Sequence, residues 1–173
     1  MELKLSTVSI LTLSLLLSSE DNISKPKEFN FNQSTIQAFY FIKHATILGD
    51  QIDNDDWIGA FNNTTCVGSR KWNGPYTDIP AMGNDNSSYS IGYLKPNDIP
   101  SFWIYDKSEE EIYYAHPSNI NQFGLGMAQI YHIDSLFVNF DCNGILGGQN
   151  KLNKYGKCIM NRIDSTKSNS QGQ

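Results

Sequence analysis

The residues best suited to chemistry are four aspartates in one short polar stretch, Asp50, Asp53, Asp55 and Asp56. Carboxylate oxygens close together on a turn are ligands that calcium prefers. The spacing lacks the EF-hand pattern, which has a glycine at the sixth position and a glutamate at the twelfth. The stretch therefore favours a solvated turn whose side chains bond nearby backbone N–H groups. If calcium binds here, its ligands are Asp50, Asp53 and Asp55.

Two carboxylates could also hydrolyse a glycosidic bond, which requires them to lie about 5–10 Å apart with one in an apolar setting. Asp55 or Asp56 beside Trp57 could be placed in this way. The three histidines are scattered singly along the sequence, and it contains no phosphate-binding glycine loop and no nucleophile elbow. We therefore expect surface carboxylates and a protein that is not an enzyme, with a small secreted glycoside hydrolase as an alternative.

Aromatic side chains offer another kind of site. Secreted β-sandwiches often stack exposed rings on the C–H faces of sugars, while polar groups hold the hydroxyls. Trp72 ends a predicted strand and borders a loop that carries Tyr76 and Asp78. Arg70 lies two residues before Trp72 and so points to the same face of that strand. These four residues form a carbohydrate-binding candidate, which is the alternative to a module of unknown ligand.

Composition and the N-terminal residues restrict the setting. The 173 residues carry a net charge of −5 without a cluster of Lys and Arg, which argues against nucleic acid as a partner. One basic residue, an apolar run from Leu5 to Leu17 and then Ser18-Ser19 are typical of a signal peptide over residues 1–19. The run is too short to span a bilayer. We expect a secreted or cell-surface protein with no transmembrane anchor in the mature chain.

Cysteine usage fits an exported chain with at most one bridge. There are three cysteines, so one thiol must stay free or pair outside the chain. Cys142 and Cys158 lie together in the tail and could pair. Cys66 sits in an apolar stretch and reads as a small buried side chain.

Strand signals dominate the rest of the chain. Aromatic and β-branched runs between turn signals predict about eight strands, with a hairpin at 57–72 as the clearest unit. Two prolines and two glycines predict a long loop at 73–88. We expect an all-β fold, an antiparallel β-sandwich that is jelly-roll-like. Strands are predicted at 36–47, 57–61, 65–72, 89–94, 102–105, 112–115 and 129–140. The expected organisation is a signal helix at 1–19, a linker at 20–30, the sandwich at 31–140, a Cys/Gly-rich repeat-like tail at 141–163 and a disordered tail at 164–173.

Several unusual tracts recur in a fixed order. Gly49-Asp50 and Asp56-Trp57-Ile58-Gly59-Ala60-Phe61 precede a returning Cys66-Val67-Gly68, and further tracts follow at 78–85, 92–93 and 98–102. Over residues 29–140 this order resembles a β-sandwich module of large secreted and cell-surface proteins of marine bacteria, associated with type IX secretion. The resemblance implies a surface or adhesion setting, and it implies no particular ligand.

The tail carries Asp141-Cys142-Asn143-Gly144, then Gly147-Gly148, and ends in Gly156-Lys157-Cys158. It is similar to an Asp-Cys-Asn-Gly repeat that follows such modules and that resembles the calcium-binding repeats of thrombospondins. The resemblance implies Asp141 and Asn143 as calcium ligands. Tyr155 stands where the first cysteine of a Cys-x-x-Cys pair is expected, so the repeat is degenerate. We expect either no cofactor or calcium.

These observations together predict a secreted, non-catalytic surface or adhesion-type module with a binding or structural role. Its expected partner is an extracellular polysaccharide or a cell-surface protein.

Overall fold

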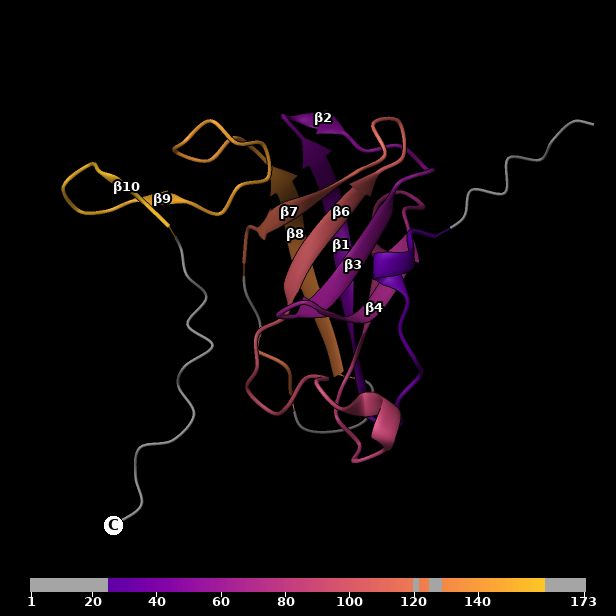
Figure 1. Ribbon diagram of the computed structural model, residues 1–173. Coiled ribbons are helices and arrows are strands. Elements are labelled where there is room, and N and C mark those ends of the chain that lie inside the picture. The colour runs from indigo at the N-terminus through magenta and orange to yellow at the C-terminus, as the bar shows by residue number, and fades with distance from the viewer. Residues whose placement is uncertain (1–24, 120–121, 125–128, 161–173) are drawn as a thin grey trace, which may run out of the picture.

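The computed structural model describes residues 25–119, 122–124 and 129–160, and its regular structure is almost entirely β (Figure 1). The all-β prediction is confirmed. The predicted leader at 1–19 and the tail at 164–173 lie outside the described residues. The elements are η1 (Lys27–Phe29), β1 (Gln37–Ile47), β2 (Asp50–Gln51), β3 (Trp57–Asn62), β4 (Thr65–Lys71), β5 (Thr77–Met82), η2 (Ser88–Ser90), β6 (Ser101–Asp106), β7 (Glu111–Pro117), β8 (Gln129–Val138), β9 (Lys151–Leu152) and β10 (Cys158–Ile159).

Strands β1 to β8 form one sheet that curls so that its two halves enclose a core, as in a β-sandwich. The order is β2-β1-β8-β7-β6-β3-β4, and β5 pairs with β1. The pairs are antiparallel apart from β1 and β8, which run parallel from the Ala38–Gln129 pair to the Ile47–Val138 pair. The sheet is therefore mixed and not wholly antiparallel, because a long crossover brings together strands that are distant in the sequence.

The main core consists of alternate residues from the strands. Tyr40, Ile58 and Ile104 are fully buried there, as the period of two requires of strands with one face toward the core. Strands β4 and β5 pack against each other and so close the curled sheet. A Cβ atom on Gly68 would overlap the carbonyl oxygen of Pro80, so only glycine allows these two backbones to meet.

A second cluster lies on the opposite face of β3 and β4, under the N-terminal segment. Phe29 of η1 is fully buried and packs edge-on against Phe61, with ring centroids 5.4 Å apart. The hydroxyl of Ser69 donates to the carbonyl oxygen of Phe29 at 2.9 Å. The end of the predicted linker is thus part of the folded body. Cys66 joins this cluster as a buried free thiol, and burial raises its pKa to about 11.

Two predictions for the middle of the chain are wrong. The predicted loop at 73–88 contains β5, because an edge strand that pairs only with β1 tolerates Pro80. The predicted strand at 89–94 is instead the short helix η2 followed by a turn. The carboxylate of Asp85 accepts hydrogen bonds from the Ser87 hydroxyl at 2.5 Å and the Ser90 hydroxyl at 2.8 Å, and these local bonds compete with strand pairing.

The hairpin β3–β4 and the strands β1, β6, β7 and β8 occur within a few residues of their predicted positions. Among the described residues, no helix has the length and apolar character needed to cross a bilayer.

Candidate functional site

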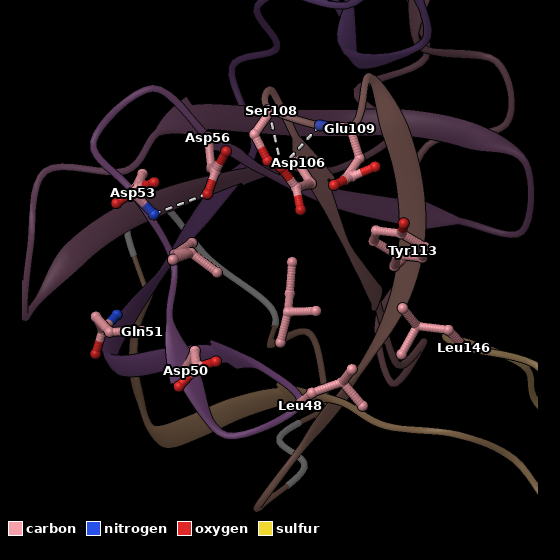
Figure 2. A pocket seen from close by; sticks show the side chains of 12 residues that line it. Leu48, Asp50, Gln51, Asp53, Asp56, Asp106, Ser108, Glu109, Tyr113 and Leu146 are labelled. Carbon is pink, nitrogen blue, oxygen red and sulfur yellow. Dashed lines mark hydrogen bonds between the residues drawn. The ribbon is translucent and has the colours of Figure 1, made fainter.

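A pocket of about 440 Å³ opens at the end of the curled sheet where β2 lies (Figure 2). This volume lies in the range of pockets that hold small ligands or side chains. Part of its wall is acidic and part is apolar. The carboxylates come from Asp50, Asp53, Asp56, Asp106 and Glu109, and the apolar lining comes from Ile47, Leu48, Ile52, Tyr113 and Leu146.

The turn between β1 and β2 forms one rim of the pocket. Leu48 and Gly49 have φ of 53° and 94°, which is the backbone of a tight two-residue hairpin. A leucine in this left-handed conformation is uncommon and strained. The turn holds the half-exposed Leu48 side chain at the mouth of the pocket, opposite the acidic wall (Figure 2).

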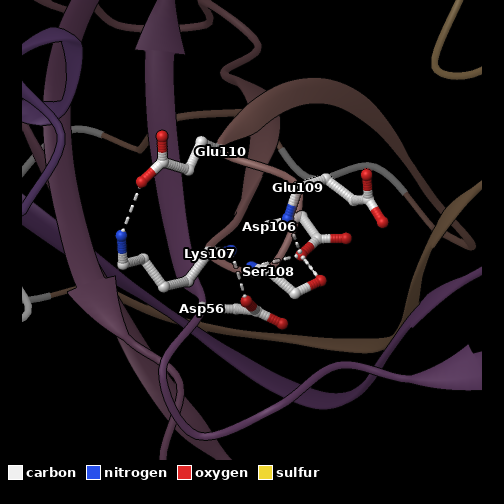
Figure 3. Close-up of polar contacts among 6 residues, drawn as sticks. All are labelled: Asp56, Asp106, Lys107, Ser108, Glu109 and Glu110. Carbon is white, nitrogen blue, oxygen red and sulfur yellow. Dashed lines mark hydrogen bonds and ion pairs between the residues drawn. The ribbon is translucent and has the colours of Figure 1, made fainter.

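The pairing of β3 with β6 builds the acidic wall. Trp57 lies opposite Tyr105, so Asp56 comes to lie beside the turn between β6 and β7. Asp56 Oδ1 accepts a hydrogen bond from the Lys107 backbone N–H at 2.8 Å (Figure 3), and Oδ2 accepts one from the Asp53 N–H at 2.8 Å (Figure 2). This buried carboxylate therefore ties two loops of the wall together.

The charge of Asp56 is costly in this position. Burial raises the pKa of its carboxyl above the ordinary value, and the neighbouring charges of Asp106 and Asp53 raise it further. The two backbone N–H groups act in the opposite direction because they favour the ionised form. The pocket therefore concentrates negative charge against partly buried walls.

The turn between β6 and β7 is ordered by Asp106. Its Oδ1 accepts hydrogen bonds from the Ser108 N–H at 2.9 Å and the Ser108 hydroxyl at 2.7 Å. Lys107 Nζ forms an ion pair with Glu110 at 3.0 Å, on the side of the turn away from Glu109 (Figure 3). The ion pairs among the described residues involve Glu28, Asp78 and Glu110, none of which lines the pocket.

The predicted calcium ligands are only partly brought together. Asp50 and Asp53 line the pocket, whereas Asp55 is exposed outside it. Within the described ranges, no group of three or more His, Cys, Asp or Glu side chains is placed to hold a metal ion. The stretch 50–56 therefore supplies three carboxylates to the pocket, those of Asp50, Asp53 and Asp56.

Asp141 organises the start of the tail. Its carboxylate accepts hydrogen bonds from the N–H groups of Asn143 at 2.8 Å, Ile145 at 3.0 Å and Asn150 at 3.2 Å, and from the Asn150 side-chain amide at 2.6 Å. The Ile145 N–H is the main cause of a lowered pKa for Asp141. Asn143 contributes its backbone N–H to this network.

The same turn recurs further along residues 139–160, which we name the arm. Asn153 Oδ1 accepts hydrogen bonds from the N–H groups of Tyr155 at 2.9 Å and Lys157 at 3.0 Å. A disulfide joins Cys142 to Cys158, the pairing that the sequence left open. The bond connects the two turns and orders the arm, whose strands β9 and β10 pair only with each other among the described strands.

Trp72, the main aromatic ring of the carbohydrate-binding candidate, is not available to a ligand. Trp72 is 3% exposed and packs in the main core, so it cannot stack on a sugar. This prediction was wrong because the face of β4 that Trp72 shares with Arg70 is the one that Ile58, paired opposite Arg70, turns toward the main core. Arg70, Tyr76 and Asp78 do line one shallow hollow of about 260 Å³. There the Arg70 guanidinium pairs with the Asp78 carboxylate at 2.7 Å, which engages both charged groups.

A row of rings crosses the outer face of the sheet, but its geometry does not suit a sugar. Trp103 and Tyr114 pack at 87° to each other, and Tyr114 packs at 75° to His116. All three are partly buried. Rings that meet edge to face pack against one another and do not present a flat platform.

Sequence reasoning found only half of the pocket. Asp50, Asp53 and Asp56 were singled out, whereas Asp106, Glu109, Tyr113 and Leu146 were not, because they lie far from that stretch in the sequence. The sequence signal that could have revealed the whole acidic wall was the presence of acidic residues at the ends of two neighbouring hairpins. Only the register of β3 against β6 places them together.

Comparison with protein-family models, with curated proteins and with solved structures finds no match for this chain. The class of this protein is therefore described from its own structure. It is an all-β protein with one curled sheet, an acidic pocket at one end of that sheet and a disulfide-linked arm beside the pocket.

Proposed function

We propose that this chain is a secreted, non-catalytic binding module of the surface or adhesion type, and that the acidic pocket is its binding site. The observation that best supports this proposal is that one cavity combines an apolar lining with a wall of carboxylates. Such a cavity suits a ligand with a basic group on an apolar stem, as in a lysine or arginine side chain of a cell-surface protein.

A binding role is supported by the way the carboxylates are used. Both oxygens of Asp56 accept backbone N–H groups, and Asp106 accepts N–H and O–H groups of its own turn. A general acid or nucleophile needs an oxygen directed at a substrate. Asp55, the alternative carboxylate beside Trp57, is exposed and does not line the pocket. The wall residues hold the pocket in shape and fix its charge.

An extracellular setting is supported by the disulfide between Cys142 and Cys158, since such bonds persist mainly in oxidising compartments. It agrees with the signal-like N-terminal residues and with the resemblance to modules of secreted bacterial proteins. The exposed carboxylates of Asp50, Asp53 and Glu109 at the pocket would attract a basic partner and orient its approach.

The test uses two blocked peptides, acetyl-Lys-Tyr-Lys-amide and acetyl-Glu-Tyr-Glu-amide, titrated into the whole protein while backbone amide signals are followed by NMR. We expect the basic peptide to shift signals at 47–56 and 106–113 with a dissociation constant of about 1 mM, and the acidic peptide to shift none. The shifts should shrink in 1 M salt, where screening acts over about 3 Å.

The variant Asp53→Asn/Glu109→Gln should weaken binding of the basic peptide, whereas Asp134→Asn, at an exposed position of β8, should not. Equal binding of both peptides, or shifts confined to other surfaces, would overturn the proposal.

A further inference from the structure

The arm exposes an unusual amount of apolar surface. Leu152 is 63% exposed, Tyr155 80%, Ile159 46% and Met160 76%. Exposed apolar groups gathered on one element are typical of interaction sites. In Figure 1 the paired strands β9 and β10 extend sideways from the end of β8, away from the body.

The arm and the body have opposite charge. Residues 139–160 contain the lysines Lys151, Lys154 and Lys157 and one acidic residue, Asp141. Residues 25–138 contain thirteen Asp and Glu against seven Lys and Arg. The basic arm and the acidic pocket are therefore complementary surfaces carried by one chain.

The tip of the arm, residues 153–157, is ordered before it meets a partner. Asn153 holds the tip through the two hydrogen bonds to Tyr155 and Lys157, and the disulfide ties the hairpin to the base of the arm. Lys154 Nζ lies 4.9 Å from the centre of the Tyr155 ring. Because the backbone of this turn is already ordered, the tip that carries Tyr155, Lys154 and Lys157 loses less conformational freedom on binding than a flexible segment would.

We propose that the arm tip of one copy binds the acidic pocket of a second copy. Tyr155 packs against the apolar lining formed by Leu48 and Tyr113, and Lys154 and Lys157 pair with the carboxylates of Asp53 and Glu109. The inference rests on the proposed function, because it names the basic partner of that pocket.

The contact must form between copies because of where the arm begins. Leu146, at its base, is itself part of the pocket lining, and Gly147 lies against Tyr113, so close that a Cβ atom would sit 2.9 Å from the Tyr113 Cβ atom. The base is thus fixed beside the pocket, while β9 and β10 extend away from the body (Figure 1). A contact between two different surfaces leaves one arm and one pocket free, so association continues into a chain or closes into a ring.

The test is sedimentation velocity of the whole oxidised protein from about 5 μM to about 500 μM, in low salt and in 1 M salt. We expect the sedimentation coefficient to rise with concentration beyond that of a dimer in low salt, and association to weaken at least about tenfold in high salt. The arm variant is Lys154→Ala/Tyr155→Ala/Lys157→Ala and the pocket variant is Asp53→Lys/Glu109→Lys, so that the mutated arm does not complement the mutated pocket. All five positions are exposed, so the variants should fold, which thermal melting verifies.

Each variant alone should remain a monomer. An equimolar mixture should form a dimer and stop there, because the arm variant retains a pocket and the pocket variant retains an arm. A monomeric wild type, an arm variant that still associates, or a mixture that stays monomeric would overturn the inference. So would a wild type that floats with vesicles of anionic lipid but does not associate with itself. If the wild type is monomeric yet the basic peptide binds the pocket, the inference fails and the proposed function stands; if neither occurs, both fail.

Discussion

The carboxylate of Asp56 accepts a hydrogen bond from the backbone N–H of Lys107, 51 residues away, at 2.8 Å. The bond joins the residue before β3 to the turn after β6. Asp56 is 4% exposed, so this contact is shielded from water and fixes the acidic wall of the pocket. One buried carboxylate thus couples the fold of the sheet to the shape of the candidate site.

The first prediction concerns this carboxylate. Asp56→Ala removes the acceptor for the N–H groups of Asp53 and Lys107, and partly buried donors left without a partner are costly. We expect a loss of about 2 kcal/mol in the free energy of unfolding, measured by urea denaturation. The neighbouring exposed Asp55→Ala is the matched control and should change stability by less than about 0.5 kcal/mol. Equal losses in the two variants would show that the Asp56 bonds are not structural.

The second prediction concerns pH. Hydrogen bonds from Ser87, then Thr35 and Ser90, lower the pKa of Asp85 below its ordinary value of 3.8. A carboxyl with a lowered pKa in the folded state stabilises the fold above the unfolded-state pKa and loses that contribution as the pH falls toward its folded value. The stability difference between wild type and Asp85→Asn should therefore be constant above about pH 5 and shrink below pH 4.

NMR titration of the Asp85 carboxyl carbon provides the direct measurement. Ser87→Ala, which removes the largest cause of the shift, should move the midpoint back toward the ordinary value. Ser108→Ala, in another turn, should leave it in place. A midpoint in the wild type at or above the ordinary value would contradict the hydrogen-bond network at 84–90.

The third prediction concerns the disulfide. The bond between Cys142 and Cys158 closes a short loop with a sequence separation of 16, which corresponds to about 3 kcal/mol of stabilisation. Because β9 and β10 pair with each other and not with the main sheet, the double variant Cys142→Ser/Cys158→Ser should loosen only the arm. Amide exchange at Asn153 and Lys157 should become about 100-fold faster while exchange in the body is unchanged.

Cys66→Ala is the reverse control, since Cys66 is buried in the cluster around Phe29. It should lower the melting temperature of the body and leave exchange in the arm as it was. A body that melts earlier in the Cys142/Cys158 variant would show that the arm supports the sheet.

The fourth prediction concerns calcium. The carboxylate of Asp141 already accepts four N–H groups, and Asp50, Asp53 and Asp55 do not converge on one point. The melting temperature should therefore be the same in 5 mM EDTA and in 5 mM calcium. An increase of several degrees with calcium, abolished by Asp141→Asn, would assign a metal site to the arm.

Local sequence features determined a good part of this protein. The aromatic and β-branched runs of β1 and β8, and the hairpin from Trp57 to Lys71, could be predicted because strand preference and turn chemistry act over a few residues. Within the acidic stretch the turn at 54–55 was recognised, although Asp50 lies in β2 and Asp56 is buried, and Cys142 and Cys158 were recognised as candidates to pair. These features require no knowledge of which strands meet.

Only the tertiary structure decided the rest. Pro80 lies in a strand because β5 is at an edge, and Trp72 is buried because the pairing of β4 with β3 puts it on the core face of the sheet. The pocket exists because β3 pairs with β6 in the register that places Asp56 beside Lys107. Register and burial depend on contacts between residues far apart in the chain, and no local pattern in the sequence encodes them.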